Sequence, residues 1–166
     1  MGQKSNSLII VESPSKAKTL KRFLGDEYAI EASVGHVRDL PKSDLGVDVD
    51  NGFSATYVPS KDKTKVISQL KSIIKKADIL YLATDPDREG EAIAWHLMEL
   101  LKPKIPVKRL AFHEITKTAI QESFDHTREI DKDLVSAQEA RRILDRLWGY
   151  LVSKKLWFNV KGGLSA

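Results

Sequence analysis

Residues 79–101 read ILYLATDPDREGEAIAWHLMELL, and this stretch decides the fold. Its first five residues form an apolar run that ends at Thr84 and a turn containing Pro86, which is the pattern of a buried strand. From residue 92 onward, apolar side chains recur at helical spacing. The stretch therefore predicts a strand, a turn and a helix, in that order.

Three carboxylates lie at alternate positions in this turn: Asp85, Asp87 and Glu89. Carboxylates crowded on one side of a turn repel one another unless a cation lies between them. Mg²⁺ suits such a site, because it binds carboxylates and substrate phosphate while it keeps several waters. The alternative is structural, since acidic residues stabilise a helix N-terminus and Arg88 could pair with one of them. The spacing alone leaves the metal site and the helix cap equally open.

Glu12 follows another predicted strand, residues 8–11, and Ser13 and Pro14 then mark the start of a helix. Strands and helices alternate along the chain, which predicts an α/β fold with a parallel sheet. Since parallel strands end at the same edge of a sheet, Glu12 and the three acids can share one site. Further strands are predicted at residues 28–34 and 107–112, one short strand at 55–58 within a loop from 42 to 65, and helices at 14–24, 66–76 and 117–124.

A long helix is predicted at residues 132–151, with Asp131 as its N-cap. One face is charged and the other is apolar. Three arginines on one face suit the binding of phosphate groups. The alternative is a solvated face on which Asp145 pairs with Arg141 or Arg142, and the pattern alone slightly favours it. The charged residues of this face are Arg141, Arg142, Asp145 and Arg146.

The composition fits a globular protein, and its charge favours an anionic partner. The 166 residues are 42% hydrophobic and 30% charged, which allows one domain and part of a second. Cysteine is absent, which excludes disulfides, thiolate zinc sites and a cysteine nucleophile from this sequence. No apolar run approaches the ~18 residues of a membrane span. The net charge is +4, of which +3 falls on residues 128–166, so phosphate backbones are candidate partners, although a basic tail can also simply aid solubility.

Five segments in order resemble one known family. They are IIVESPSKAKTL at 9–20, SVGHVRDLP at 33–41, LATDPDREGEAIAWHL at 82–97, FHEIT at 112–116 and AQEARRILDRLWGY at 137–150. Together they are similar to the N-terminal part of the bacterial DNA topoisomerase I family, the type IA topoisomerases. The first four look like the family's Toprim domain. Several independent motifs in the same order make the resemblance specific, and they span nearly the whole chain.

The resemblance implies an architecture and a role for individual residues. Residues 1–127 would form a Toprim domain, a Rossmann-like parallel sheet flanked by helices, and residues 128–166 the first helices of a DNA-binding domain. The implied catalytic residues are Glu12, Lys16, His36 and Arg88. The implied Mg²⁺ ligands are Asp85, Asp87, Glu89 and Glu12. The implied contacts to single-stranded DNA are Arg142, Asp145 and Arg146, with Arg141 and Tyr150 as weaker candidates.

The activity implied by the family is the relaxation of negatively supercoiled DNA without ATP, by Mg²⁺-dependent cleavage and religation of one strand through a phosphotyrosine. The nucleophilic tyrosine of the family lies in a later domain, and none of Tyr28, Tyr57, Tyr81 and Tyr150 stands in that motif. We therefore expect this stretch to be inactive alone. We also expect a monomer that is cytoplasmic and nucleoid-associated, without a membrane partner.

Two other functions remain open. A D-x-D motif with an upstream glutamate also occurs in primase-like enzymes and nucleases of the Toprim class, although the motif at 137–150 favours a topoisomerase. The second alternative is a nucleic-acid-binding module without catalytic activity, in which changes to the carboxylates would leave every activity of the complete protein intact.

Overall fold

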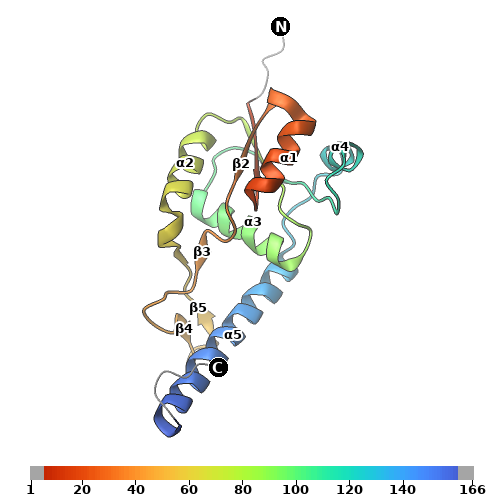
Figure 1. The fold of residues 1–166 in the computed structure, drawn as a ribbon. Coiled ribbons are helices and arrows are strands. Elements are labelled where there is room, and N and C mark those ends of the chain that lie inside the picture. The colour runs from red at the N-terminus through yellow and green to blue at the C-terminus, as the bar shows by residue number, and fades with distance from the viewer. Residues whose placement is uncertain (1–5, 161–166) are drawn as a thin grey trace.

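The structure is a computed structural model that describes residues 6–160, and a four-stranded sheet lies at its centre (Figure 1). The strands are ordered β2-β1-β7-β8, and all three neighbouring pairs are parallel. Helices cover both faces, so the predicted Rossmann-like α/β fold is confirmed. The strands are β1 (Ser7–Val11), β2 (Tyr28–Ala32), β7 (Ile79–Leu82) and β8 (Val107–Arg109).

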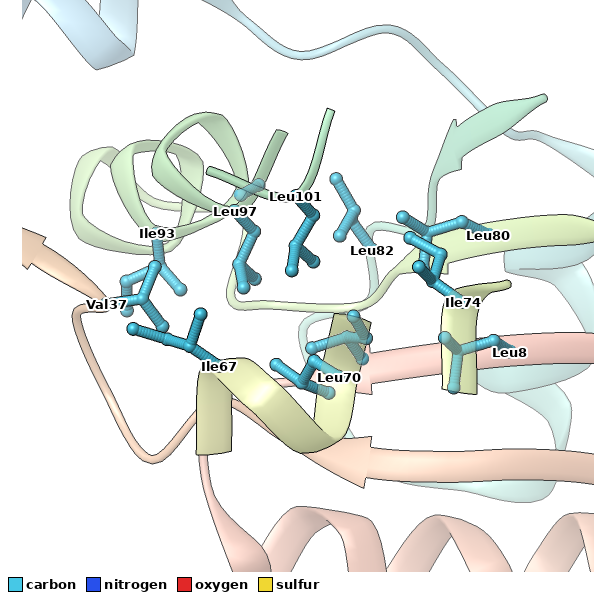
Figure 2. Close-up of a cluster of buried hydrophobic side chains, with 12 residues drawn as sticks. Leu8, Val37, Ile67, Leu70, Ile74, Leu80, Leu82, Ile93, Leu97 and Leu101 are labelled. Atoms are coloured by element: carbon cyan, nitrogen blue, oxygen red, sulfur yellow. The ribbon is translucent and has the colours of Figure 1, made fainter. Parts of the chain in front are cut away.

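One face of the sheet is covered by α2 (Thr64–Ile74) and α3 (Arg88–Leu101). Successive side chains of a strand point to opposite faces, and Leu8 of β1 points toward these helices. Figure 2 shows Leu70 of α2 and Leu97 of α3 in the same cluster. Burying one such leucine stabilises the fold by about 1.5–3 kcal/mol. This apolar layer therefore fixes α3 on the sheet, and with it the turn that leads into α3.

The other face is covered by α1 (Pro14–Leu24) and α4 (Lys117–Asp125). Ile9, which follows Leu8 in β1, points toward them and belongs to a second apolar cluster with Leu20 and Ile120. Alternate side chains of β1 thus enter two different cores, and α1 and α4 pack against the strand that ends directly before Glu12.

Three helices begin at their predicted caps, whereas α2 has no side-chain cap and begins at Thr64, two residues before its predicted start. The Ser13 hydroxyl accepts from a backbone N–H in the first turn of α1, and Thr116 does the same for α4. Asp131 caps α5 (Lys132–Asn159) by accepting from two backbone N–H groups. At the other end of α1, Gly25 has a φ of 65°, a conformation that favours glycine and stops the helix.

The chain between the second strand and α2 folds into two short antiparallel ladders, not into the single strand predicted at residues 55–58. Residues 55 and 58 lie in different ladders, and Thr56 and Tyr57 link the two. The Thr56 N–H donates to the carbonyl of Gly46, which holds this link in place. The first ladder pairs β3 (Arg38–Asp39) with β6 (Val58–Pro59), and the second pairs β4 (Val47–Asp48) with β5 (Ser54–Ala55). A 3-10 turn at Lys61–Lys63 leads into α2, and another at Gly25–Glu27 leads into β2.

Helix α5 packs against α3 and then runs away from the sheet (Figure 1). It continues to Asn159, beyond the predicted end at residue 151, since no proline interrupts it and its one glycine is tolerated within a helix. Its far half exposes large apolar side chains, among them Trp148, Trp157 and Phe158. Within residues 6–160, no helix combines the length and apolarity that crossing a membrane requires.

Candidate active site

The candidate site lies at the carboxyl edge of the sheet, where two neighbouring strands end. Glu12 follows β1 directly, and Asp85 follows β7, its parallel neighbour. Lys16, one turn into α1, places its Nζ between them and forms ion pairs with Glu12 Oε1 and Asp85 Oδ1. Burial alone would lower the pKa of Lys16, but the hydrogen bonds to Asp85 and Glu12 outweigh it and raise the pKa above its ordinary value. The site therefore holds a charged ammonium between two carboxyl groups.

The second oxygen of Glu12, Oε2, is buried and has no hydrogen-bond partner within the described part of the chain. Leaving a buried polar atom unpaired costs about 1–3 kcal/mol, and more for a charged group. A cation at the strand ends would supply the missing partner. Carboxylate oxygens are the ligands that Mg²⁺ prefers, so the residues present fit this ion.

The three acids of the turn have three different partners. Asp87 is the N-cap of α3, and its Oδ1 accepts from the Gly90 N–H at 2.7 Å. Glu89 lies inside the helix with its Oε1 3.6 Å from His36 Nε2, and its side chain is 64% exposed. Among residues 6–160, no three Asp, Glu or His side chains are grouped closely enough to enclose a metal ion. Helix capping is therefore found for Asp87, while the metal site stays a prediction.

The helical start at Arg88 explains this divergence. The prediction placed the three carboxylates on one side of the turn, but α3 begins between Asp87 and Glu89. Arg88 itself is exposed and forms no ion pair with the acids beside it or with any other described residue.

The turn itself is tightly constrained. A Cβ at Gly90 would lie 2.0 Å from the Asp85 carbonyl oxygen, so only glycine fits this position. The buried Thr84 hydroxyl donates to the Gly90 carbonyl at 2.7 Å. Arg109 Nη2 donates to the Asp85 carbonyl at 2.7 Å. The backbone that carries the acids is thus held from two sides.

A buried ion pair behind the turn was missed in the sequence. Arg109 of β8 is 1% exposed, Glu91 of α3 is 0% exposed, and Arg109 Nε donates to Glu91 Oε1 at 3.0 Å. Burial lowers the pKa of Arg109, although the charge of Glu91 opposes this effect. The available signal was an arginine on the same strand face as Val107, and a glutamate beside the apolar stripe of a helix.

The arginines of α5 bind the segment that follows β2. Arg142 makes two hydrogen bonds to the Asp39 carboxylate, at 2.9 and 2.8 Å. Arg146 Nη1 donates to the carbonyl of Pro41 at 2.8 Å and to that of Asp44 at 3.2 Å. The sequence offered Asp145 as an ion-pair partner of Arg142, but in the structure Arg142 pairs with Asp39 instead.

The other predicted DNA contacts are Arg141, Asp145 and Tyr150. Arg141 pairs with Asp145 at 3.8 Å on an exposed face, as the solvated alternative expected. Four of the five predicted DNA-binding residues line one open groove of about 670 Å³ that Trp157 and Phe158 extend. These four are Arg142, Asp145, Arg146 and Tyr150, and Arg141 lies outside the groove lining.

A smaller cavity of about 260 Å³ lies between this groove and the acidic turn. His36, Tyr57, His96 and Arg142 are among its lining residues. Burial, with Arg38 and His36 nearby, lowers the pKa of His96 to about 4, so His96 is neutral at pH 7. His36 thus faces both this cavity and Glu89, which connects the α5 side of the molecule with the acids.

Comparison with known families identifies the class. The model of the Toprim domain matches residues 7–115, which include the whole parallel sheet and the acidic turn. The chain belongs to the Toprim domain family.

Individual relatives narrow this further. The chain is 56% identical to DNA topoisomerase 1 of Streptomyces coelicolor, over 96% of this chain and 18% of that protein. It is 54% identical to DNA topoisomerase 1 of Mycobacterium tuberculosis, again over 96% and 18%. The structure of full-length topoisomerase I from Thermotoga maritima superposes with a TM-score of 0.86 at 50% identity, covering 96% of this chain and 27% of that one. The chain thus spans about a fifth of the curated relatives it matches, and the family resemblance seen in the sequence is confirmed.

Proposed function

We propose that the chain is the N-terminal, Toprim-containing part of a type IA DNA topoisomerase. The complete enzyme relaxes negatively supercoiled DNA without ATP, by transient cleavage and religation of one strand through a phosphotyrosine. The observation that carries this proposal is the Glu12–Lys16–Asp85 cluster at the ends of β1 and β7, in a chain whose relatives are named DNA topoisomerase 1.

The cluster provides half of an active site for phosphoryl transfer. Lys16 is charged and can donate to a phosphate oxygen, where preorganised positive charge stabilises the transition state. Glu12 is the general acid or base for the oxygen that leaves or attacks. Glu12, Asp85, Asp87 and Glu89 would hold Mg²⁺, which supplies charge neutralisation and orientation of the phosphate when it is bound. Support for this ion comes from Glu12 Oε2, which is buried without a hydrogen-bond partner among residues 6–160.

Two further side chains assist at the rim of the site. His36 lies beside Glu89 and lines the cavity that leads to α5, so it can contact the DNA strand near the acids. Arg88 is exposed at the start of α3 and free to reach a phosphate. Both are assigned as assisting catalytic residues.

The groove of α5 is the proposed grip on single-stranded DNA. Arg142, Arg146 and Tyr150 line it, and Asp145 adds a hydrogen-bond acceptor for a base. Arg141 contributes from the neighbouring exposed face. Phosphate contacts from the arginines would position the strand, and the exposed Tyr150 ring offers a surface for base stacking.

The proposal includes the organisation of the protein. Residues 1–127 are the Toprim domain and residues 128–166 begin the helical DNA-binding domain. The enzyme is a cytoplasmic, nucleoid-associated monomer. The stretch of 166 residues is inactive alone, because without the nucleophilic tyrosine no covalent intermediate can form.

A chimaera tests the function. The 166 residues replace the matching region of the Streptomyces coelicolor relative, and relaxation of a negatively supercoiled plasmid is followed on gels with and without Mg²⁺. We expect Mg²⁺-dependent relaxation that Glu12→Gln slows by about 10²–10⁴-fold. Glu99→Gln, the same chemical change at an exposed position of α3, is the control and should leave the rate unchanged.

The same assay separates the rival functions. Full relaxation by the Glu12→Gln chimaera would favour a binding module without a catalytic role. Nucleotide polymerisation or Mg²⁺-dependent nicking by the 166 residues alone would favour another enzyme of the Toprim class. A covalent DNA adduct formed by the 166 residues alone would contradict the predicted inactivity.

A further inference from the structure

Glu91 is a fully buried carboxylate to which the proposed function assigns no role. It lies in the first turn of α3 at 0% exposure. A buried carboxylate is costly unless charged and hydrogen-bonding partners surround it. Its partners come from two parts of the molecule that are far apart in the sequence, and this arrangement is the basis of the inference.

The two oxygens of Glu91 divide the partners between them. Oε1 accepts from Arg109 Nε at 3.0 Å and from Arg128 Nη2 at 2.7 Å. Oε2 accepts from the backbone N–H of Asp131 at 3.0 Å. One carboxylate therefore joins β8 to the segment that leads into α5.

Arg109 carries the connection toward the acids. While Nε binds Glu91, Nη2 donates to the Asp85 carbonyl at 2.7 Å and Nη1 to the Leu82 carbonyl at 2.9 Å. These two carbonyls lie at the end of β7 and at the first acid of the turn. The planar guanidinium fixes its donors relative to one another, so a shift of Glu91 displaces the backbone of the turn.

Arg128 and Asp131 carry the connection toward α5. Arg128 exchanges two backbone hydrogen bonds with Arg109, at 3.0 and 3.1 Å, in addition to its side-chain contact with Glu91. Asp131 is the N-cap of α5, and the hydrogen bond from its N–H to Glu91 therefore fixes where the helix starts. The start of α5 is thus bound to the same carboxylate as the support of the acidic turn.

We propose that Glu91 is a positioning residue that couples α5 to the acidic turn at residues 84–90. A ligand that shifts one of them then changes the affinity of the other for its own ligand. The identity of the two ligands, Mg²⁺ at the turn and single-stranded DNA on α5, rests on the proposed function. Coupling between two sites is reciprocal, so Mg²⁺ strengthens DNA binding by the factor by which DNA strengthens Mg²⁺ binding.

Three variants of the 166-residue chain test this coupling. Glu91→Gln keeps the shape of the side chain and removes its charge. Arg128→Gln removes a contact on the α5 side of Glu91 and leaves the hydrogen bonds of Arg109 to the turn in place. Glu99→Gln is the matched control, exposed on the same helix. Backbone amide NMR shifts are recorded without metal, followed by Mg²⁺ titration, and single-stranded DNA affinity is measured by fluorescence anisotropy with and without Mg²⁺.

The expected result is a change at both ends of the network. In metal-free Glu91→Gln, amide shifts change in residues 84–90 and in the first turn of α5. Loss of a residue that orients metal ligands typically weakens metal binding by about 10–100-fold, and we expect about tenfold here because Glu91 acts through Arg109. Arg128→Gln changes the shifts of the turn in the same direction by a smaller amount. Glu99→Gln leaves the shifts of both segments and the Mg²⁺ affinity at wild-type values.

Several outcomes would overturn the coupling. One is a folded Glu91→Gln chain whose shift changes stay within α3. Another is wild-type Mg²⁺ affinity together with an unchanged effect of Mg²⁺ on DNA binding. If the wild-type chain binds no Mg²⁺, the proposed function fails at this site, and the metal-free shifts still decide whether Glu91 couples the two segments. If Glu91→Gln does not fold, Arg128→Gln decides, since unchanged shifts at residues 84–90 contradict the coupling.

Discussion

The ion pair between Arg142 of α5 and Asp39 of β3 tests how the long helix is held. Two hydrogen bonds of 2.9 and 2.8 Å join the guanidinium to both carboxylate oxygens, which is the strong bidentate geometry. The side chains are 38% and 40% exposed, so solvent screens much of the attraction. Exposed pairs contribute about 0.2–1 kcal/mol, and the bidentate geometry places this pair near 1 kcal/mol.

A double-mutant cycle measures this energy directly. Asp39→Asn, Arg142→Gln and the double variant are unfolded in urea, and the coupling is the part of the destabilisation that is not additive. The pair of Arg141 and Asp145, at 3.8 Å on an exposed face, is the control and should give a coupling of about 0.3 kcal/mol or less. A coupling for Asp39 and Arg142 no larger than that of the control would refute the reasoning.

The same pair predicts a dependence on pH. Burial would raise the pKa of Asp39, but the hydrogen bonds from Arg142 and from the Leu40 N–H outweigh it and hold the pKa below its ordinary value. A carboxyl group with a lowered pKa in the folded state stabilises the protein above its unfolded pKa of about 4 and loses this contribution as the pH falls through the folded pKa. The measured coupling should therefore be constant from pH 7 to about 5 and decline below about 4. A coupling that grows on acidification would contradict the sign.

Three further predictions concern the acids, the groove and the turn. We expect calorimetry to detect weak Mg²⁺ binding by the wild-type chain and the double variant Asp85→Asn, Asp87→Asn to lose it, and identical heats in both would remove the proposed site. Arg146→Ala should weaken single-stranded DNA binding about equally for all sequences and flatten its salt dependence by roughly 0.7 in slope, and an unchanged slope in anisotropy titrations would exclude a phosphate contact. Gly90→Ala should destabilise the chain by about 1–3 kcal/mol in urea denaturation, because its Cβ would lie 2.0 Å from a carbonyl oxygen. Gly149→Ala is the control, since among residues 6–160 no atom outside its own helix backbone lies within 4 Å of the added Cβ, and alanine should stabilise the helix by up to about 1 kcal/mol.

The features that could be predicted from the sequence are those determined by local chemistry. The caps at Ser13, Thr116 and Asp131 satisfy N–H groups only two or three residues away, so the sequence around them is sufficient. The adjacency of Glu12 and Asp85 followed from a general rule, because parallel strands end at one edge of a sheet. The two-residue ladders between β2 and α2 could not be predicted, since strands so short carry no period.

Which charged residues pair with one another in the site depends on the tertiary fold, so these pairs could not be predicted from the sequence. Glu91 and Arg109 lie 18 positions apart, and Arg142 lies 103 positions from Asp39. In each pair the two residues lie on different helices or strands, so the period of a single helix or strand cannot connect them. The pattern therefore placed Arg142 and Arg146 on one charged face of α5, and could not show that they bind the chain itself.

The two anchors of α5 give its arginines a role in folding as well as a proposed role in binding. At its start the helix is bound to Glu91, and further along, Arg142 and Arg146 bind the segment of residues 39–44. That segment follows His36, which lies beside Glu89 in the acidic turn. The helix is therefore connected to the acids by two separate routes, one through buried charges and one over the surface. Because arginines that are already ordered lose less conformational entropy when a phosphate binds, the same contacts that hold α5 in place would preorganise the groove for a DNA strand.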